Sequence, residues 1–191
     1  TLEGAMMEPL SVGLHAVRRG EVKLGDSIAI LGGGCIGMMT LLAAKAHGAA
    51  RIIVTDVANS HLDKALELGA TDVINSKDSD PVEMINQLTG GTAGIPATAA
   101  QTSYIVKWGG TIVMVGNILP EVSYSFRNIY RKEAQIKGVF RYHSTYPIAI
   151  QAVSTGKINV KSIVTGVCDF MDSHAAFVNS LDNKDHCIKN V

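Results

Sequence analysis

The chain has 191 residues, of which 47% are hydrophobic and 18% charged, enough for one globular domain or one domain with part of a second. Lysine plus arginine and aspartate plus glutamate number 17 each, so the formal net charge is zero, which argues against a nucleic-acid binder or a polybasic membrane-surface protein. The aromatic content of 5% argues against a stacking surface for single-stranded nucleic acid, and no apolar run is long enough to span a bilayer.

Short β-branched, apolar runs alternate with helical stretches along most of the chain. The runs at 27–32, 51–56 and 111–115 predict buried strands, with shorter candidates at 72–74 and 134–139. The stretches between them predict helices at 36–47, 60–68, 81–88 and 97–107. This alternation predicts an α/β fold in which right-handed βαβ units build a doubly wound parallel sheet.

One interval interrupts the alternation. A doubly wound sheet needs a strand between the helices predicted at 81–88 and 97–107, but the stretch from Thr89 to Pro96 holds three glycines, a proline and one β-branched apolar residue. Such a composition cannot form a central strand. Either the sheet is unusual or residues are missing from this stretch.

A glycine-rich turn follows the first predicted strand. Residues 32–37 read Gly-Gly-Gly-Cys-Ile-Gly, which satisfies G-x-G-x-x-G between a strand and a helix, the context in which this motif binds a dinucleotide. Gly32 permits the tight turn, Gly34 lets a pyrophosphate approach the backbone, and Gly37 lets the helix pack close to the strand. The phosphates are expected at the helix N-terminus, where free N–H groups favour anions.

An acidic residue stands where the motif needs one. Asp56 ends the second predicted strand, 19 residues after Gly37, and no arginine directly follows it. A carboxylate there accepts hydrogen bonds from the adenosine ribose and repels a 2′-phosphate, which favours NAD over NADP. Proteins that bind FAD or S-adenosylmethionine share the pattern, and in the simplest alternative the glycines only end a strand while Asp56 caps a turn.

The cysteines and histidines show no metal-ligand spacing. Cys35, Cys168 and Cys187 are odd in number and far apart, which favours a reducing compartment, and we expect a cytoplasmic protein. Cys35 lies near a predicted helix N-terminus, which can lower the pKa of a thiol, although a packing role is favoured.

Four further segments carry a family resemblance, at 4–16 (GAMMEPLSVGLHA), 22–27 (VKLGDS), 136–142 (IKGVFRY) and 158–161 (INVK). Together with the glycine turn they resemble the zinc-dependent, medium-chain alcohol dehydrogenases, and within them the polyol branch of sorbitol (L-iditol) and xylitol dehydrogenases. The resemblance implies a Rossmann-type coenzyme domain flanked by pieces of a GroES-like catalytic domain that is itself absent from this sequence.

The resemblance also implies a division of the chain. Residues 1–20 are expected to form a linker helix from the catalytic domain, 21–142 the dinucleotide-binding domain, and 143–191 C-terminal helices that return toward the catalytic domain. The family has a strand of pattern D-V-V-F-E-x-x-G where this chain has Gly94-Ile95-Pro96, so about eight or nine residues, one strand and its turn, are expected to be lacking. Because losing a central strand is expected to unfold the domain, a segment omitted from the sequence is favoured over a true deletion.

Candidate site residues follow from the matched segments. Glu8 is implied at the zinc, as a ligand or beside the zinc-bound water, although it also suits the first turn of a predicted helix starting near Pro9. Arg141 and Tyr142 are implied to contact substrate hydroxyls, and Arg141 also the coenzyme. His61 stands where relatives often carry a basic residue for the adenosine end. The other implied coenzyme contacts are Cys35, Ile36, Val115, Gly116, Asn117, Val139 and Phe140.

The function implied by the resemblance is NAD-dependent oxidation of a sugar alcohol to a ketose by zinc-assisted hydride transfer. This chain is expected to supply the coenzyme-binding part, to bind NAD weakly and not to turn over alone. The alternatives are another zinc alcohol dehydrogenase, acting on butanediol, threonine or a sugar-phosphate alcohol, and a non-catalytic dinucleotide-binding module. A homodimer or homotetramer is expected through the edge at 117–124, where Ser123, Tyr124 and Phe126 lie, because an exposed sheet edge pairs readily.

Overall fold

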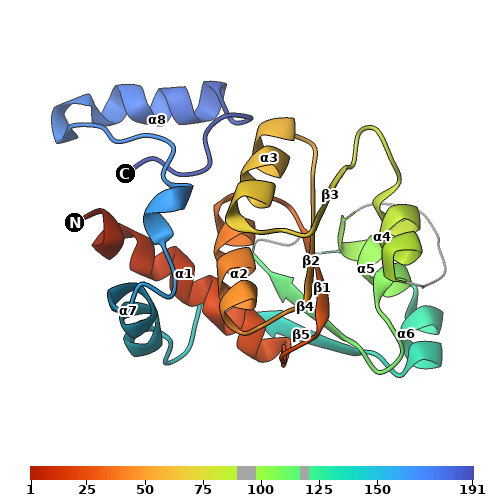
Figure 1. Ribbon diagram of the computed structural model, residues 1–191. Coiled ribbons are helices and arrows are strands. Elements are labelled where there is room, and N and C mark those ends of the chain that lie inside the picture. The colour runs from red at the N-terminus through yellow and green to blue at the C-terminus, as the bar shows by residue number, and fades with distance from the viewer. Residues whose placement is uncertain (90–97, 117–120) are drawn as a thin grey trace.

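Two parallel sheets lie between two layers of helices in the computed structural model, which describes residues 1–89, 98–116 and 121–191 (Figure 1). The first sheet has the strand order β1-β2-β3, formed by β1 (Ser27–Leu31), β2 (Arg51–Asp56) and β3 (Asp72–Asn75). The second sheet pairs β4 (Thr111–Val115) with β5 (Gln135–Val139). All three strand pairs are parallel, as βαβ units require.

Helices cover both faces of the sheets (Figure 1). One layer contains α1 (Leu2–Arg19), α2 (Cys35–Ala46) and α3 (Asn59–Leu68). The opposite layer contains α4 (Pro81–Thr89), α5 (Thr98–Ile105) and α6 (Phe126–Lys132). After β5 come α7 (Tyr146–Ser154), the 3-10 turns η1 (Val160–Ile163) and η2 (Phe170–Asp172), and α8 (Ser173–Asp182).

The predicted α/β fold is confirmed, and each strand and helix predicted between 27 and 139 lies within about two residues of its expected bounds, whereas α6 was not predicted. The strand at 51–56 matches its prediction at both ends because its β-branched side chains are buried on both faces. The interval that interrupts the alternation falls largely on residues 90–97, which lie outside the described residues.

The position of Glu8 within its helix corrects one expectation. A linker helix was expected over residues 1–20, and the first-turn reading of Glu8 assumed a start near Pro9; α1 begins at Leu2, where the hydroxyl of Thr1 accepts the N–H of Gly4 at 3.2 Å. Glu8 is therefore an exposed residue in the middle of α1, and the reading of Glu8 as a first-turn charge is wrong. The helix starts early because it buries an apolar face, on which Met6 and Leu10 are fully buried.

The main core lies between α1, α2 and the first sheet. Gly13 of α1 faces the backbone of Met39 in α2, and a Cβ there would lie 2.6 Å from the carbonyl carbon of Met39. Only glycine therefore allows these two helices to pack so closely. A smaller core on the opposite face packs Ile53, Ile74 and Ile85 together. Within the described ranges, no helix combines the length and the apolar character needed to cross a membrane.

Candidate coenzyme and substrate site

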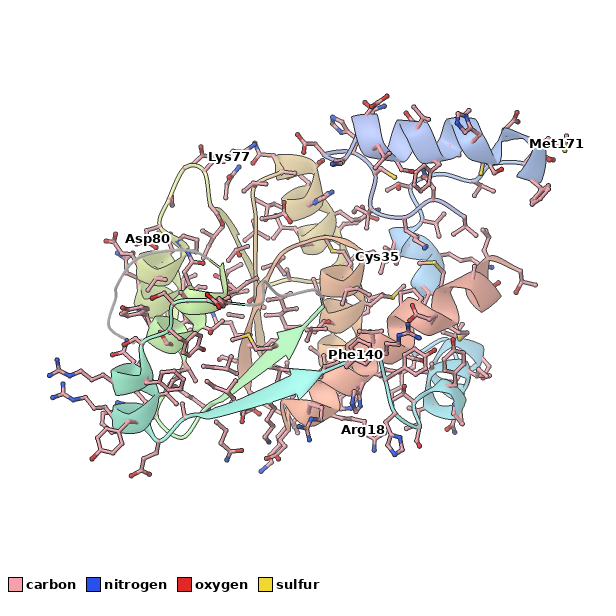
Figure 2. The ribbon with its side chains drawn as sticks, turned by 180° about the vertical axis from the view of Figure 1, so that it is seen from behind. Arg18, Cys35, Lys77, Asp80, Phe140 and Met171 are labelled. Atoms are coloured by element: carbon pink, nitrogen blue, oxygen red, sulfur yellow. The ribbon has the colours of Figure 1, made fainter. Side chains whose placement is uncertain are left out.

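The predicted site residues gather at the carboxyl ends of the strands, where ligands bind in open α/β sheets. Gly32 follows β1, Asp56 ends β2, and Val115 pairs in register with Val139 at the ends of β4 and β5. Figure 2 shows Cys35 at the start of α2 and Phe140 just beyond β5. Asn117, also expected here, lies outside the described residues.

The glycine turn is open where a ligand would approach and closed where the helix packs. Gly32 has a φ of 111°, and a Cβ added there or at Gly34 would meet no atom within 4 Å. A Cβ on Gly37, by contrast, would overlap the carbonyl oxygen of Gly32. Each glycine thus meets the requirement that the motif sets for its position.

The N-terminus of α2 faces the same open turn. Gly34 is the N-cap residue and has no side chain to accept the first N–H groups of the helix, while its carbonyl accepts the N–H of Met38 at 2.9 Å. The N–H groups of the first turn therefore have no intrahelical partner. Together with the helix dipole they make this end of α2 suitable for a phosphate.

Asp56 directs its carboxylate toward the glycine turn. The N–H of Gly33 donates to Oδ2 at 2.6 Å, and those of Val57 and Ala58 donate to Oδ1 at 2.7 and 2.9 Å. Burial raises the pKa of Asp56, but these N–H groups together with nearby His61 outweigh it and hold the pKa below its ordinary value. The carboxylate is therefore ionised at neutral pH, and of its roughly four acceptor positions one remains free of a backbone donor.

His61 lies behind Asp56. Its Nδ1 is 3.4 Å from Oδ1 of Asp56, and its side chain is 12% exposed. Both ring nitrogens are buried without a hydrogen-bond partner among the described residues. The imidazole therefore packs beside Asp56, and it is shorter than the lysine or arginine side chain that could extend toward a ligand.

Glu8, Tyr142 and Tyr146 come from distant parts of the chain to one neighbourhood. The rings of Tyr142 and Tyr146 are 5.1 Å apart between centroids and tilted by 56°. The hydroxyl of Tyr142, and at longer range the charge of Glu8, raise the pKa of Tyr146. Tyr142 and Tyr146, the latter not singled out by the sequence, thus lie together, within range of the charge of Glu8.

A buried hydrogen bond positions this group. The hydroxyl of Thr145 is fully buried and donates to the carbonyl oxygen of Ser11 at 3.2 Å. Ser11 lies one helical turn after Glu8 on α1, and Thr145 directly precedes α7. The bond therefore attaches the loop that carries Tyr142 to the helix that carries Glu8.

Arg141 stands at the mouth of the same region. Its φ of 62° lies in the left-handed region, where residues other than glycine are strained. Its guanidinium lies 5.5 Å from the ring centroid of Phe140, which is 86% exposed. Both side chains are thus accessible to a ligand beyond the end of β5.

The C-terminal segment brings a cation to the start of α2. Burial, and to a smaller degree Glu8, raise the pKa of the Cys35 thiol, while Lys189 opposes this shift. The raised pKa agrees with a packing role for Cys35. Lys189 reaches this position because the segment around Asn190 pairs with Gly166. Because Lys189 lies far from the glycine turn in the sequence, no motif could have indicated it.

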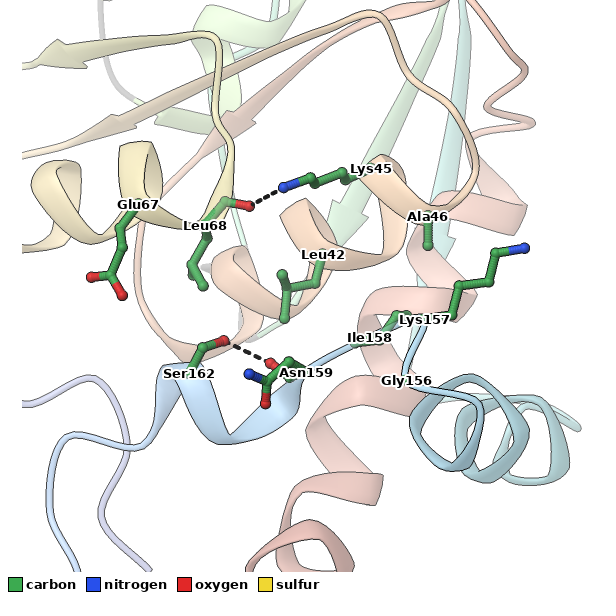
Figure 3. A pocket seen from close by; sticks show the side chains of 10 residues that line it. All are labelled: Leu42, Lys45, Ala46, Glu67, Leu68, Gly156, Lys157, Ile158, Asn159 and Ser162. Carbon is green, nitrogen blue, oxygen red and sulfur yellow. Dashed lines mark hydrogen bonds between the residues drawn. The ribbon is translucent and has the colours of Figure 1, made fainter.

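A hollow of about 500 Å³ lies elsewhere, between the C-terminal ends of α2 and α3 and the segment before η1 (Figure 3). Lys45 points across it and donates to the carbonyl oxygen of Leu68 at 3.0 Å, at the end of α3. Helix C-termini carry partial negative charge and disfavour phosphate. This hollow is therefore not the dinucleotide site.

Comparison with known proteins decides the family. A family model described as zinc-binding dehydrogenase matches residues 35–155, which is more than half of the chain. The chain belongs to the zinc-binding dehydrogenase family.

Curated and solved relatives agree with this zinc-binding dehydrogenase assignment. An uncharacterised zinc-type alcohol dehydrogenase-like protein of Escherichia coli, YdjJ, is 43% identical over 199 aligned positions that cover all of this chain and 57% of its own length. Bovine sorbitol dehydrogenase is 41% identical over 85% of this chain and 49% of its own. A crystal structure of an E. coli oxidoreductase of unknown specificity superposes with a TM-score of 0.93 at 42% identity, covering 100% of this chain and 57% of that one. The chain spans about half the length of these relatives.

The family name raises the question of zinc. Across residues 1–89, 98–116 and 121–191, no group of three or more histidine, cysteine, aspartate or glutamate side chains is placed to hold a metal ion. A zinc site needs three or four protein ligands, and Glu8 alone supplies one carboxylate. The described residues therefore do not fit a complete zinc site, and no step through zinc is assigned to them.

Proposed function

We propose that this zinc-binding dehydrogenase chain is the NAD-binding part of an enzyme that oxidises a sugar alcohol to a ketose. The observation that carries the proposal is the glycine turn, open at Gly32 and Gly34 and closed at Gly37, with the Asp56 carboxylate beside it. The identity to mammalian sorbitol dehydrogenases supports the polyol substrate.

The coenzyme is held in the proposal by three kinds of group. The first-turn N–H groups of α2 bind the pyrophosphate, and Lys189 adds a positive charge close to Cys35. The free acceptor position of Asp56 takes a ribose hydroxyl, while its charge repels a 2′-phosphate. Ile36 is proposed to contact the coenzyme at the glycine turn, and the nicotinamide side is proposed to be lined by Val115, Gly116, Val139, Phe140 and, outside the described residues, Asn117. When bound, the nicotinamide supplies the hydride acceptor.

The substrate is proposed to lie between the nicotinamide side and α1. Glu8 provides an exposed carboxylate, and Tyr142 and Arg141 provide donors for a hydroxyl-rich molecule. Thr145 fixes the distance between these groups through its bond to Ser11. In the full enzyme the zinc ligands are proposed to come from the part of the relatives' length that this chain does not span, with Glu8 beside the metal.

The proposed dimer or tetramer uses the edge near α6. Phe126 is strongly exposed and packs edge-to-face on Tyr124, with ring centroids 6.0 Å apart. The Tyr124 hydroxyl lies 2.5 Å from that of Thr102, so the pair is anchored to α5. This anchored aromatic surface supports an oligomer contact there, and light scattering that finds only monomer would contradict it.

Calorimetric titration of the chain with NAD and NADP tests the coenzyme proposal. We expect saturable NAD binding and NADP binding weaker by about tenfold or more, because the carboxylate repels the extra phosphate. Asp56→Asn is expected to reduce this preference, whereas Asp63→Asn, the same change of charge on the exposed face of α3, is expected to leave it intact. Equal or tighter NADP binding by the unmodified chain contradicts the assignment of Asp56.

A further inference from the structure

The hollow between α2, α3 and the segment before η1 has the dimensions of a ligand site (Figure 3). Its volume of about 500 Å³ falls within the range that small-molecule sites usually occupy. The residues of α2 that line it are Leu42, Lys45 and Ala46, at the end of the helix opposite to the glycine turn. The hollow is therefore separate from the proposed coenzyme site.

Both walls of the hollow are fixed by the main core. Its apolar floor consists of Leu42 from α2, Leu68 from α3 and Ile158 from the segment before η1, and all three belong to one core cluster. Val160 and Ile163 of η1 are buried in the same cluster. Walls that are already ordered lose little conformational entropy when a ligand binds, so the hollow is a preformed site.

Lys45 is held across one side of the hollow. Its ammonium donates to the carbonyl oxygen of Leu68, the last residue of α3, at 3.0 Å (Figure 3). Gly69 follows with a φ of 108°, and a Cβ there would overlap the Lys45 side chain, so glycine leaves room for the lysine to cross. An ammonium carries three N–H groups, and those not used by Leu68 remain as donors for a ligand.

The other lining side chains add both donors and acceptors. Oδ1 of Asn159 accepts the N–H of Lys161 at 3.2 Å, which directs the two N–H groups of its amide to other partners. The Ser162 hydroxyl donates to the carbonyl of Asn159 at 2.6 Å, so its oxygen keeps the capacity to accept. Glu67 contacts Lys64 through Oε2 at 2.8 Å and keeps Oε1 as an acceptor.

The charges around the hollow are already compensated. The Glu67 carboxylate is paired with Lys64, and the Lys45 ammonium offsets the partial negative charge at the C-terminal end of α3. Lys157 also lines the hollow, but its side chain extends away from the others (Figure 3). An ionic ligand would compete with these existing pairings, whereas a neutral ligand would leave them intact.

We propose that this hollow binds a small, neutral, polyhydroxylated molecule, of the class of sugars and sugar alcohols. Each hydroxyl of such a molecule both donates and accepts, which matches donors on Lys45 and Asn159 combined with acceptors on Glu67 and Ser162. Its C–H groups contact the apolar floor. The proposal does not rest on the proposed function, because the hollow shares no lining residue with the proposed coenzyme and substrate sites.

An NMR titration of the ¹⁵N-labelled chain with sorbitol tests the site. We expect saturable shifts in the side-chain amide signals of Asn159 and in the backbone amide signals of Gly156 and Ser162. Two compounds of the same chain length serve as comparisons: gluconate, which carries a carboxylate, and hexane-1,6-diol, which lacks the inner hydroxyls. Both are expected to bind at least about fivefold more weakly at these residues.

Two variants test the lining. Asn159→Asp keeps an acceptor for the N–H of Lys161 but removes the two amide donors, and it is expected to weaken sorbitol binding about tenfold. The matched control is Asn128→Asp on α6, in the opposite helix layer, which is expected to leave binding unchanged. Ala46→Leu fills the hollow from α2 with another good helix former, and it is expected to abolish binding while the cooperative unfolding transition is retained.

Four results overturn the proposal. They are the absence of saturable shifts around the hollow, equal binding of gluconate, equal binding of the diol, and undiminished binding by folded Asn159→Asp or Ala46→Leu. Sorbitol shifts confined to Arg141 and Tyr142 also overturn it, and they leave the proposed function intact. Shifts at the hollow without any at Arg141 and Tyr142 support the hollow and count only against the proposed substrate site.

Discussion

The two sheets of this zinc-binding dehydrogenase chain differ in how deeply their strands are buried. The first sheet has three strands, of which the central strand β2 buries four of its six residues, and it leads into an open glycine turn. The second has two strands, of which β5 buries only Val139. Both sheets are parallel, but among the described strands only β2 of the first sheet has a paired strand on each side, and it is the best buried. The difference teaches that, among the described residues, the sheet that leads into the glycine turn has the better-buried central strand.

The largest expected effect is a substitution in the first sheet's half of the chain, where α2 packs most closely on the turn after β1. Gly37→Val places a side chain against the Gly32 carbonyl, so we expect loss of the cooperative unfolding transition monitored by circular dichroism. Gly34→Ala adds a methyl group in open space three residues away and is expected to destabilise by about 1 kcal/mol or less. A cooperative transition retained in Gly37→Val argues against the close packing of α2 on β1.

A pair of truncations compares the two halves directly. Ile53→Ala in β2 removes a fully buried side chain and is expected to lower the free energy of unfolding by about 3 kcal/mol, measured in urea. Val113→Ala in β4 of the second sheet removes a half-buried side chain, with an expected loss of about 1 kcal/mol. Equal losses would show that β4 is as well covered as β2.

A pH titration tests how much the Asp56 carboxylate, beside the glycine turn, contributes to the free energy of unfolding. The pKa of Asp56 is lower in the folded chain than the value of about 3.9 expected when unfolded, so its contribution is present above that value and is lost as pH falls through the folded pKa. We expect Asp56→Asn to lose less stability than the unmodified chain below about pH 4. Parallel acid limbs of the two proteins in urea titrations argue against this contribution.

The smallest expected effects come from the ion pairs of each half. In the first, Arg51 contacts Asp72 through two bonds of 2.8 and 3.2 Å, and in the second Lys137 contacts Glu21 at 2.6 Å. All are partly exposed, so replacing either cation with methionine is expected to shift Tm by about 2 °C or less. A larger Tm shift for Lys137→Met than for Arg51→Met would show that the ion pair of the second sheet contributes more to stability than that of the first.

The sequence predicted the elements whose stability is local or whose pattern is strong. The run at 51–56 and the turn at 32–37 are such cases, because β-branched burial and glycine geometry act within a few residues. The first-turn reading of Glu8 was wrong because the tertiary burial of Met6 and Leu10, more than any local signal, determines where α1 begins.

The site was only partly predictable for the same reason. The coenzyme motif is contiguous, whereas the approach of Tyr146 to Glu8 depends on packing between α1 and α7. The charge of Lys189, about 150 residues further along the chain, opposes the raised pKa of the Cys35 thiol, and the adjacent Asn190 pairs with Gly166. Contacts over such separations leave no periodic signal in a single sequence.

The bond from Thr145 to Ser11 has a mechanical consequence. α1 packs on α2, whose first turn is the proposed phosphate seat, and the same α1 is tied to the loop of Arg141 and Tyr142. A tilt of α1 would therefore move the first turn of α2 and the loop of Arg141 and Tyr142 together. Under the proposed function, any displacement of α1 moves the proposed phosphate-binding turn together with Arg141 and Tyr142, so their relative positions stay coupled.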